Sequence, residues 1–142
     1  MPRNFSHYKQ VDSKDCGPTC LKIIAKYYGK TLQIQSLRDF SETTRSGSNL
    51  LLLSDAAEKI GFKTLGVKLS LNRLDEVSLP CILHRNKNHY VVLYKIKKGK
   101  YYISDPALRS VLMKSTANVS CLCGIFIYLL VWFCTAPNTI LL

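Results

Sequence analysis

The sequence predicts an α+β domain in which helices come first and an antiparallel sheet follows. Apolar residues recur at helical spacing up to about Gly61, and from Phe62 onward the spacing changes toward two. The 142 residues fit one domain with one core. An apolar share of 47% and a charged share of 20% are ordinary for a globular protein and argue against disorder.

Three helices are expected in the first half of the chain. Gly17 and Pro18 precede the first one, at the point where a helix start tolerates proline, and Gly29 ends it. Gly61 can cap the third helix at its carboxyl end. The expected helices are Thr19 to Tyr28, Ile34 to Phe40 and Leu50 to Ile60.

Short runs rich in β-branched and aromatic residues predict strands in the second half. The turn Lys97-Lys98-Gly99 joins the last two of these runs as an antiparallel hairpin. The expected strands are Phe62 to Leu69, Cys81 to His84, His89 to Ile96 and Lys100 to Ser104.

The chain changes in character after Asp105. No Asp or Glu follows that residue, and Cys121 to Cys134 is a nearly unbroken apolar run, shorter than the ~20 residues of a membrane span. We therefore divide the sequence into a domain over residues 1–108 and an atypical apolar tail over residues 109–142. Three interpretations of the tail remain open: a buried terminal strand or helix, a marginal membrane anchor, or the product of a truncated or frame-shifted gene.

Charge and cysteine spacing narrow the range of partners and cofactors. Twenty Lys and Arg against nine Asp and Glu give a formal charge of +11, but these residues are scattered, and the one tight lysine cluster, at residues 95–100, suits a solvated turn better than a phosphate groove. Nucleic acid is therefore not an expected partner. The six cysteines show no paired C-x-x-C pattern, and no G-x-x-x-x-G-K-[ST] loop occurs, so neither a metal nor another cofactor is expected.

Cys16 is the candidate nucleophile. It stands directly before the expected first helix, where free backbone N–H groups and the helix dipole favour a thiolate. The same N–H groups would face an oxyanion formed by attack of the sulfur on a carbonyl, and Gln10 could add a donor from its amide. For a single cysteine, the alternative of a small buried core residue is more common.

His89 and Asp105 are the candidate base and its orienting acid. Of the three histidines, His89 opens an apolar strand directly after a polar turn, which places its ring at the end of the sheet. Asp105 ends the strand paired with it, so the hairpin brings the carboxylate near the imidazole. A surface histidine that leads a strand is the structural alternative.

Five motifs follow one another over about 100 residues of the chain. They are Gln10-x-Asp-x-x-Asp-Cys-Gly-Pro-Thr-Cys-Leu21, Thr44-Arg45-x-Gly47, Leu79-Pro-Cys81, Asn88-His-Tyr-Val-Val92 and Asp105-Pro-Ala107. In this order they resemble the bacteriocin-processing peptidase domain at the N-terminus of peptidase-containing ABC transporters. The cysteine-glycine pair alone would be weak support.

The resemblance implies a papain-like fold and cleavage of a leader peptide after a double-glycine motif. It assigns Cys16, His89 and Asp105 to catalysis and Gln10 to the oxyanion hole, and it leaves His84 and Cys20 to packing or the surface. The implied partners are a leader peptide and the membrane-spanning and ATPase parts of an ABC transporter, which this chain lacks. The implied location is the cytoplasmic side of the bacterial inner membrane, with membrane contact through the tail as an open alternative.

Two other functions remain open from the sequence. One is a catalytically idle module, or a truncated transporter fragment, that only binds the leader peptide. The other is a small basic membrane-tethered protein whose tail is the functional part. The presence of Cys16 together with His89 favours the peptidase, because a pure binding module needs neither.

Overall fold

The structure is a computed structural model that describes residues 5–41, 49–69, 71–77, 79–85, 89–108, 111–115 and 127–134. In these ranges helices precede strands, and the α+β prediction is confirmed. The helical elements are α1 (Cys16–Tyr27), α2 (Ile34–Phe40), α3 (Leu50–Lys59) and the 3₁₀ helix η1 (Leu71–Glu76). The strands are β1 (Phe62–Leu69), β2 (Cys81–Arg85), β3 (His89–Lys97), β4 (Lys100–Ser104), β5 (Val111–Ser115) and β6 (Ile127–Cys134).

Helix α1 begins earlier than the sequence suggests. Its first residue is Cys16, with Asp15 as the N-cap, so Cys16 lies within the first turn and not just before the helix. The expected start at Thr19 was wrong because Pro18 can occupy the first turn, where its missing N–H has no partner to lose. The helix is held to the sheet by its apolar face, which packs against β3 and includes Cys20, Leu21, Ile23 and Ile24.

The other two helices end and begin as their local sequence predicts. Helix α2 has the predicted bounds. Asn49 caps α3 by accepting a hydrogen bond from the backbone N–H of Leu52 at 2.8 Å, which satisfies one of the free donors of the first turn. Gly61 follows the end of α3 with φ +96, a backbone conformation that side chains disfavour, so its predicted role after the helix is confirmed.

Within the residues that the structure describes, the sheet has six antiparallel strands in the order β1-β6-β2-β3-β4-β5. The predicted turn between β3 and β4 is confirmed, with Lys98 at φ 51 and Gly99 at φ 71, the positive values that a tight hairpin turn of this hand requires. Beyond β4, Ser104 leads directly into Asp105. The hairpin thus returns the chain to the end of the sheet at which β3 begins.

Two segments of the predicted tail are strands of this sheet. Strand β5 pairs with β4 at one edge, and β6 lies between β1 and β2, antiparallel to both. For residues 127–134 the structure therefore agrees with the interpretation as a strand. The division of the chain at residue 108 stays a prediction. Within the described ranges, no helix combines the length and the apolar character needed to cross a membrane.

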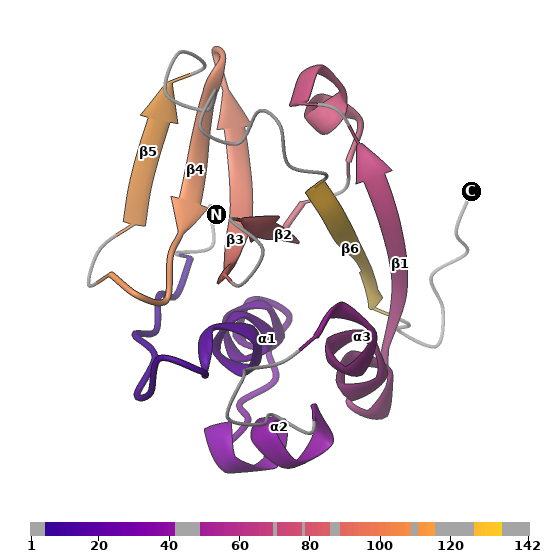
Figure 1. Cartoon of the computed structure of the whole chain (residues 1–142). Helices are drawn as coiled ribbons and strands as arrows, with labels where there is room; N and C mark the ends of the chain where they lie inside the picture. The colour runs from indigo at the N-terminus through magenta and orange to yellow at the C-terminus, as the bar shows by residue number, and fades with distance from the viewer. Residues whose placement is uncertain are drawn as a thin grey trace.

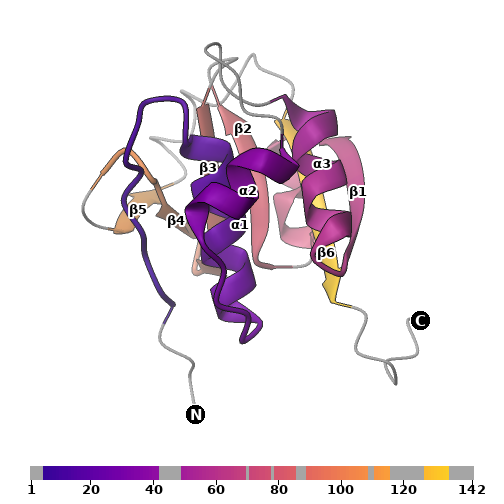
Figure 2. The same cartoon turned by 90° about the horizontal axis from the view of Figure 1, so that it is seen from below.

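The three helices lie on one side of the sheet, with α1 and α3 against it and α2 over these two (Figures 1 and 2). Each face of the sheet has its own core cluster. Along β3, Tyr90 and Val92 face the helices, whereas Val91 and Leu93 belong to the opposite cluster with Leu74 of η1. This alternation is the period of two that a strand imposes. Because both faces of β3 are buried, the position of His89 at its first residue is tightly fixed.

Candidate active site

Cys16 lies in the first turn of α1 and is only 4% exposed. Backbone N–H groups of a first helical turn have no partner within the helix, and they point toward the end at which the cysteine sits. The residue before it is also fixed, since the carbonyl of Asp15 accepts a hydrogen bond from the N–H of Thr19 at 2.9 Å. The sulfur is therefore held on a rigid element, at the positive end of the helix dipole.

His89 contacts both Asp105 and Cys16. Its Nε2 lies 2.6 Å from Oδ1 of Asp105, and its ring is also hydrogen-bonded to the side chain of Cys16. The hydrogen bond to Asp105 first, and then the one to Cys16, raise the pKa of His89 from 6.5 to about 9, although partial burial opposes the shift. Since Nε2 is hydrogen-bonded to the carboxylate of Asp105, Nδ1 is the ring nitrogen that can bond to the thiol of Cys16.

Asp105 is held in place by the turn that follows β4. Its side chain is only 7% exposed, and Oδ1 accepts a second hydrogen bond from the backbone N–H of Ala107 at 2.9 Å. A buried carboxylate with two donors favours one orientation of the imidazole. The predicted approach of Asp105 to His89 through the hairpin is therefore confirmed.

Gln10 is joined to the same turn through its backbone. Its N–H donates to the carbonyl oxygen of Pro106 at 2.8 Å, which brings Gln10 beside the segment that carries Asp105. The Oε1 atom of Gln10 is buried and has no hydrogen-bond partner among the described residues. The structure thus places Gln10 near the other three candidates, and its role in an oxyanion hole remains a prediction.

His84 and Cys20 take the packing positions expected for them. The His84 ring stacks on Tyr90, with 4.6 Å between the ring centroids. Cys20 is fully buried one turn beyond Cys16, and burial raises the pKa of its thiol well above the ordinary value. Cys81 is likewise buried, with its pKa raised for the same reason. These two thiols are poor nucleophiles because their charged form is penalised by desolvation.

An ion pair that the sequence did not reveal supports the start of α1. Arg38 of α2 binds the carboxylate of Asp15 with two nitrogens, Nε at 2.8 Å and Nη2 at 2.5 Å. The Asp15 side chain is 3% exposed, and it also accepts a hydrogen bond from the N–H of Asp12 at 3.0 Å. No local pattern could have indicated this pair, because it joins two helices separated by a loop.

We predict that Arg38→Gln lowers the Tm by about 5 °C, because it leaves the Asp15 carboxylate buried without its cation. Thermal unfolding followed by circular dichroism measures the change. The matched control is Arg73→Gln, which breaks the exposed pair between Arg73 and Glu76 and is expected to leave the Tm nearly unchanged. Equal effects of the two substitutions would contradict the stabilising role of Arg38.

Four residues of the motifs lie outside the described part of the chain. They are Thr44, Arg45, Gly47 and Asn88. Among the described residues, no group of His, Cys, Asp and Glu could hold a metal ion.

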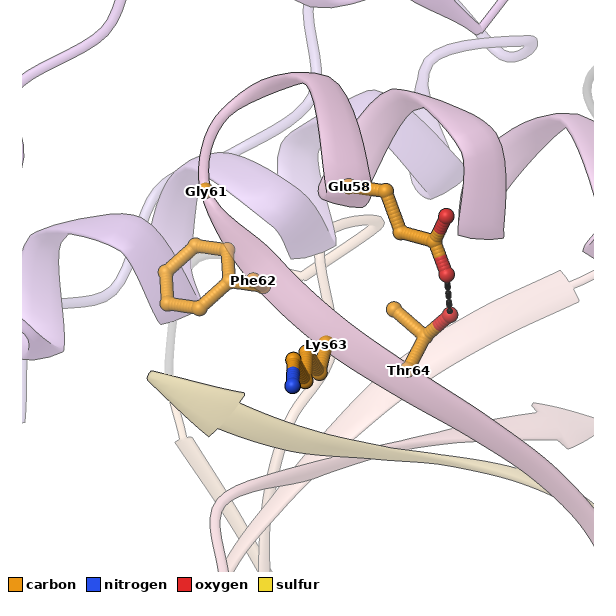
Figure 3. A pocket seen from close by; sticks show the side chains of 5 residues that line it. All are labelled: Glu58, Gly61, Phe62, Lys63 and Thr64. Carbon is orange, nitrogen blue, oxygen red and sulfur yellow. Dashed lines mark hydrogen bonds between the residues drawn. The ribbon is translucent and has the colours of Figure 1, made fainter. Parts of the chain in front are cut away.

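A separate shallow pocket of about 470 Å³ lies where α3 passes into β1, with Thr64 hydrogen-bonded to Glu58 (Figure 3). Its lining consists of Glu58, Gly61, Phe62, Lys63 and Thr64.

Helices on one face of an antiparallel sheet, with a cysteine at a helix start hydrogen-bonded to a histidine and through it to an aspartate, define a peptidase domain of papain-like fold. The chain belongs to the Peptidase C39 family, which it matches over residues 4–128.

Curated relatives agree with this assignment. The colicin V secretion/processing ATP-binding protein of Escherichia coli is 34% identical over 98 residues, which are 69% of this chain and 14% of that protein. The lactococcin-G-processing and transport ATP-binding protein of Lactococcus lactis is 38% identical over 104 residues, 69% of this chain and 15% of the relative. The chain thus spans only a small part of these proteins.

Solved structures show the same fold. A double-glycine motif protease from an AMS/PCAT transporter, solved with its leader peptide, superposes with a TM-score of 0.83 at 27% identity, over 93% of this chain and 95% of that chain. The peptidase domain of Streptococcus ComA, a bifunctional ABC transporter of a quorum-sensing pathway, gives a TM-score of 0.81 at 29% identity, over 90% and 98%. The papain-like fold expected from the resemblance is confirmed.

Proposed function

We propose that this chain is a cysteine endopeptidase that cuts the leader peptide from a bacteriocin-like precursor after a double-glycine motif. Cys16 is the nucleophile, His89 the general base and then acid, Asp105 the group that orients His89, and Gln10 a donor to the oxyanion. The observation that carries the proposal is the continuous hydrogen-bonded row from Cys16 through His89 to Asp105.

The first half of the reaction uses the thiol of Cys16. Its proton moves to the imidazole of His89, and the sulfur attacks the carbonyl carbon of the second glycine of the leader. The negative oxygen that results is stabilised by backbone N–H groups of the first turn of α1, with the amide of Gln10 as the second donor. Asp105 stabilises the imidazolium, which agrees with the pKa of about 9 for His89.

The second half releases both products. The imidazolium gives its proton to the nitrogen of the mature peptide, so the C–N bond breaks and a thioester remains between Cys16 and the leader. His89 then takes a proton from a water molecule that attacks the thioester, and the leader leaves with a free carboxylate. Two glycines at the cut suit a channel too narrow for a Cβ atom, so exclusion of larger residues contributes to selectivity.

The names of the relatives support a proposal for the larger protein assembly in which this domain acts. The two relatives described above are named as secretion or transport proteins that also process their cargo and bind ATP. We propose that this peptidase domain acts beside the membrane-spanning and ATPase parts of such a transporter, on the cytoplasmic side of the bacterial inner membrane. The cut would then precede export of the mature peptide.

The test is incubation of the purified chain with a synthetic precursor that carries a double-glycine leader, followed by mass spectrometry. We expect a single cut after the second glycine. A matched precursor with both glycines replaced by alanine should be cut roughly 10- to 200-fold more slowly, the range that small steric differences in a pocket give. Binding of the leader without any cut would favour the idle binding module, and equal cleavage of both precursors would contradict the selectivity.

A further inference from the structure

The N-terminal segment crosses the turn that carries Asp105, and His7 makes two contacts with that turn. Its Nδ1 lies 2.6 Å from Oγ of Ser104, and its Nε2 lies 2.7 Å from the carbonyl oxygen of Leu108. These partners stand on either side of Asp105 in the chain. One histidine ring therefore joins both ends of the turn that holds the carboxylate facing His89.

The chemistry of the two contacts determines which ring nitrogen of His7 carries a hydrogen. A carbonyl oxygen only accepts, so Nε2 of His7 carries the hydrogen and donates to Leu108. In the neutral ring Nδ1 then accepts from the hydroxyl of Ser104, which is fully buried. The turn is closed from within as well, since the N–H of Leu108 donates to the carbonyl of Asp105 at 3.0 Å.

Further contacts anchor the segment on both sides of His7. The ring of Phe5 stacks on Tyr94 of β3, with 4.2 Å between centroids and 6° between planes. Beyond His7, the N–H of Gln10 donates to the carbonyl of Pro106, inside the same turn. His7 thus lies on a segment that is fixed at both ends and has little freedom to leave the turn.

We propose that His7 is a positioning residue, which holds the turn from Ser104 to Leu108 so that the carboxylate of Asp105 stays against the imidazole of His89. Its effect on cleavage rests on the proposed peptidase function. Its effect on the His89 imidazole does not depend on any substrate, so the two can be tested separately.

Loss of the His7 ring nitrogens leaves the Ser104 hydroxyl and the Leu108 carbonyl without these partners, which loosens the turn. Asp105 then spends less time in contact with His89. The groups that face His89 are Cys16 and Asp105, both by direct hydrogen bonds. Of these groups only Asp105 lies on the turn, so the expected change comes through Asp105.

The test compares the parent chain with three variants by NMR titration of the His89 imidazole and by kinetics on a double-glycine precursor. His7→Phe keeps a ring without nitrogens, and His7→Gln keeps a donor that can reach the Leu108 carbonyl. Lys9→Gln is the matched control, because it changes an exposed side chain of the same segment and leaves both contacts of His7 and the stacking of Phe5 intact. Circular dichroism establishes that each variant is folded.

We expect His7→Phe to lower the pKa of His89 from about 9 toward 6.5 and to lower kcat about tenfold with KM unchanged. His7→Gln should lie between the parent and His7→Phe, and Lys9→Gln should match the parent. An unchanged His89 titration in folded His7→Phe would overturn the proposal, as would an equal shift in Lys9→Gln. A parent chain that never cuts the precursor would refute the peptidase function and leave the titration to decide on His7.

Discussion

Cys16→Ala abolishes cleavage of a double-glycine precursor, with kcat/KM reduced at least roughly 10⁴-fold, because the alanine cannot form the thioester. The matched control is Cys20→Ala. Cys20 is a buried thiol of the same helix, one turn away, and its raised pKa excludes it as a nucleophile. This control is expected to keep most of the activity, with at most a loss of stability from the small cavity.

Chemical labelling checks the same assignment without a substrate. Iodoacetamide should alkylate Cys16 fastest among the cysteines of α1, as peptide mass mapping would reveal, because the Cys16 side chain is hydrogen-bonded to the base His89, whereas burial raises the pKa of the Cys20 thiol. Cleavage that survives in Cys16→Ala would refute the mechanism. Loss of activity in both cysteine variants, with both folded, would show that the cavity and not the nucleophile is responsible.

Asp105→Asn is expected to reduce kcat/KM roughly 10²- to 10⁴-fold, since an amide neither stabilises the imidazolium nor fixes the ring tautomer. It should also shift the pH dependence. Asp105 is the largest cause of the raised pKa of His89, so the imidazolium of the variant loses its proton at a lower pH than about 9. Cleavage needs the one proton that Cys16 and His89 share, because the imidazolium gives it to the leaving nitrogen. The activity of the variant should therefore fall at lower pH than that of the parent as the pH rises.

The matched control for this prediction is Asp55→Asn, which removes one negative charge at an exposed position of α3. It is expected to leave both kcat/KM and the pH profile unchanged. Profiles of kcat/KM from pH 5 to 10 for the parent and both variants are the measurement. An unshifted alkaline limb in Asp105→Asn would separate Asp105 from the protonation of His89 and contradict the assignment.

The local sequence was sufficient to predict those helices and strands whose ends are set by nearby turn and capping residues. The bounds of α2 and β4 agree with the prediction, and the turn at Lys98 and Gly99 has the positive φ values that its residues favour. That turn pairs Lys97 with Lys100 and returns the chain toward the end of β3 at which His89 lies, so the approach of Asp105 to His89 could be inferred without a structure. The register shift between Leu93 and Lys95 could not be inferred. The predicted turn at Lys98 and Gly99 was therefore the main basis for placing Asp105 near His89.

The features that could not be predicted depend on contacts between distant parts of the chain. The start of α1 is supported by Asp15, whose carboxylate is bound by Arg38 of another helix. The contacts of His7 join residues that are 97 and 101 positions apart, and no spacing rule covers such a pair. The apolar run from Cys121 to Cys134 lacks a period of two, so its pattern could not distinguish a strand from a helix.

The place of β6 in the sheet has a consequence for how the protein is made on the ribosome. In the described part of the sheet, β1 hydrogen-bonds only to β6, although β1 is synthesised long before it. The hairpins of β2, β3 and β4, together with Cys16 and His89, can assemble before β6 is synthesised. During that time the backbone hydrogen-bonding groups of β1 have no partner strand. An unpaired edge invites pairing with other chains, so newly made molecules would be most vulnerable to aggregation just before the last strand emerges.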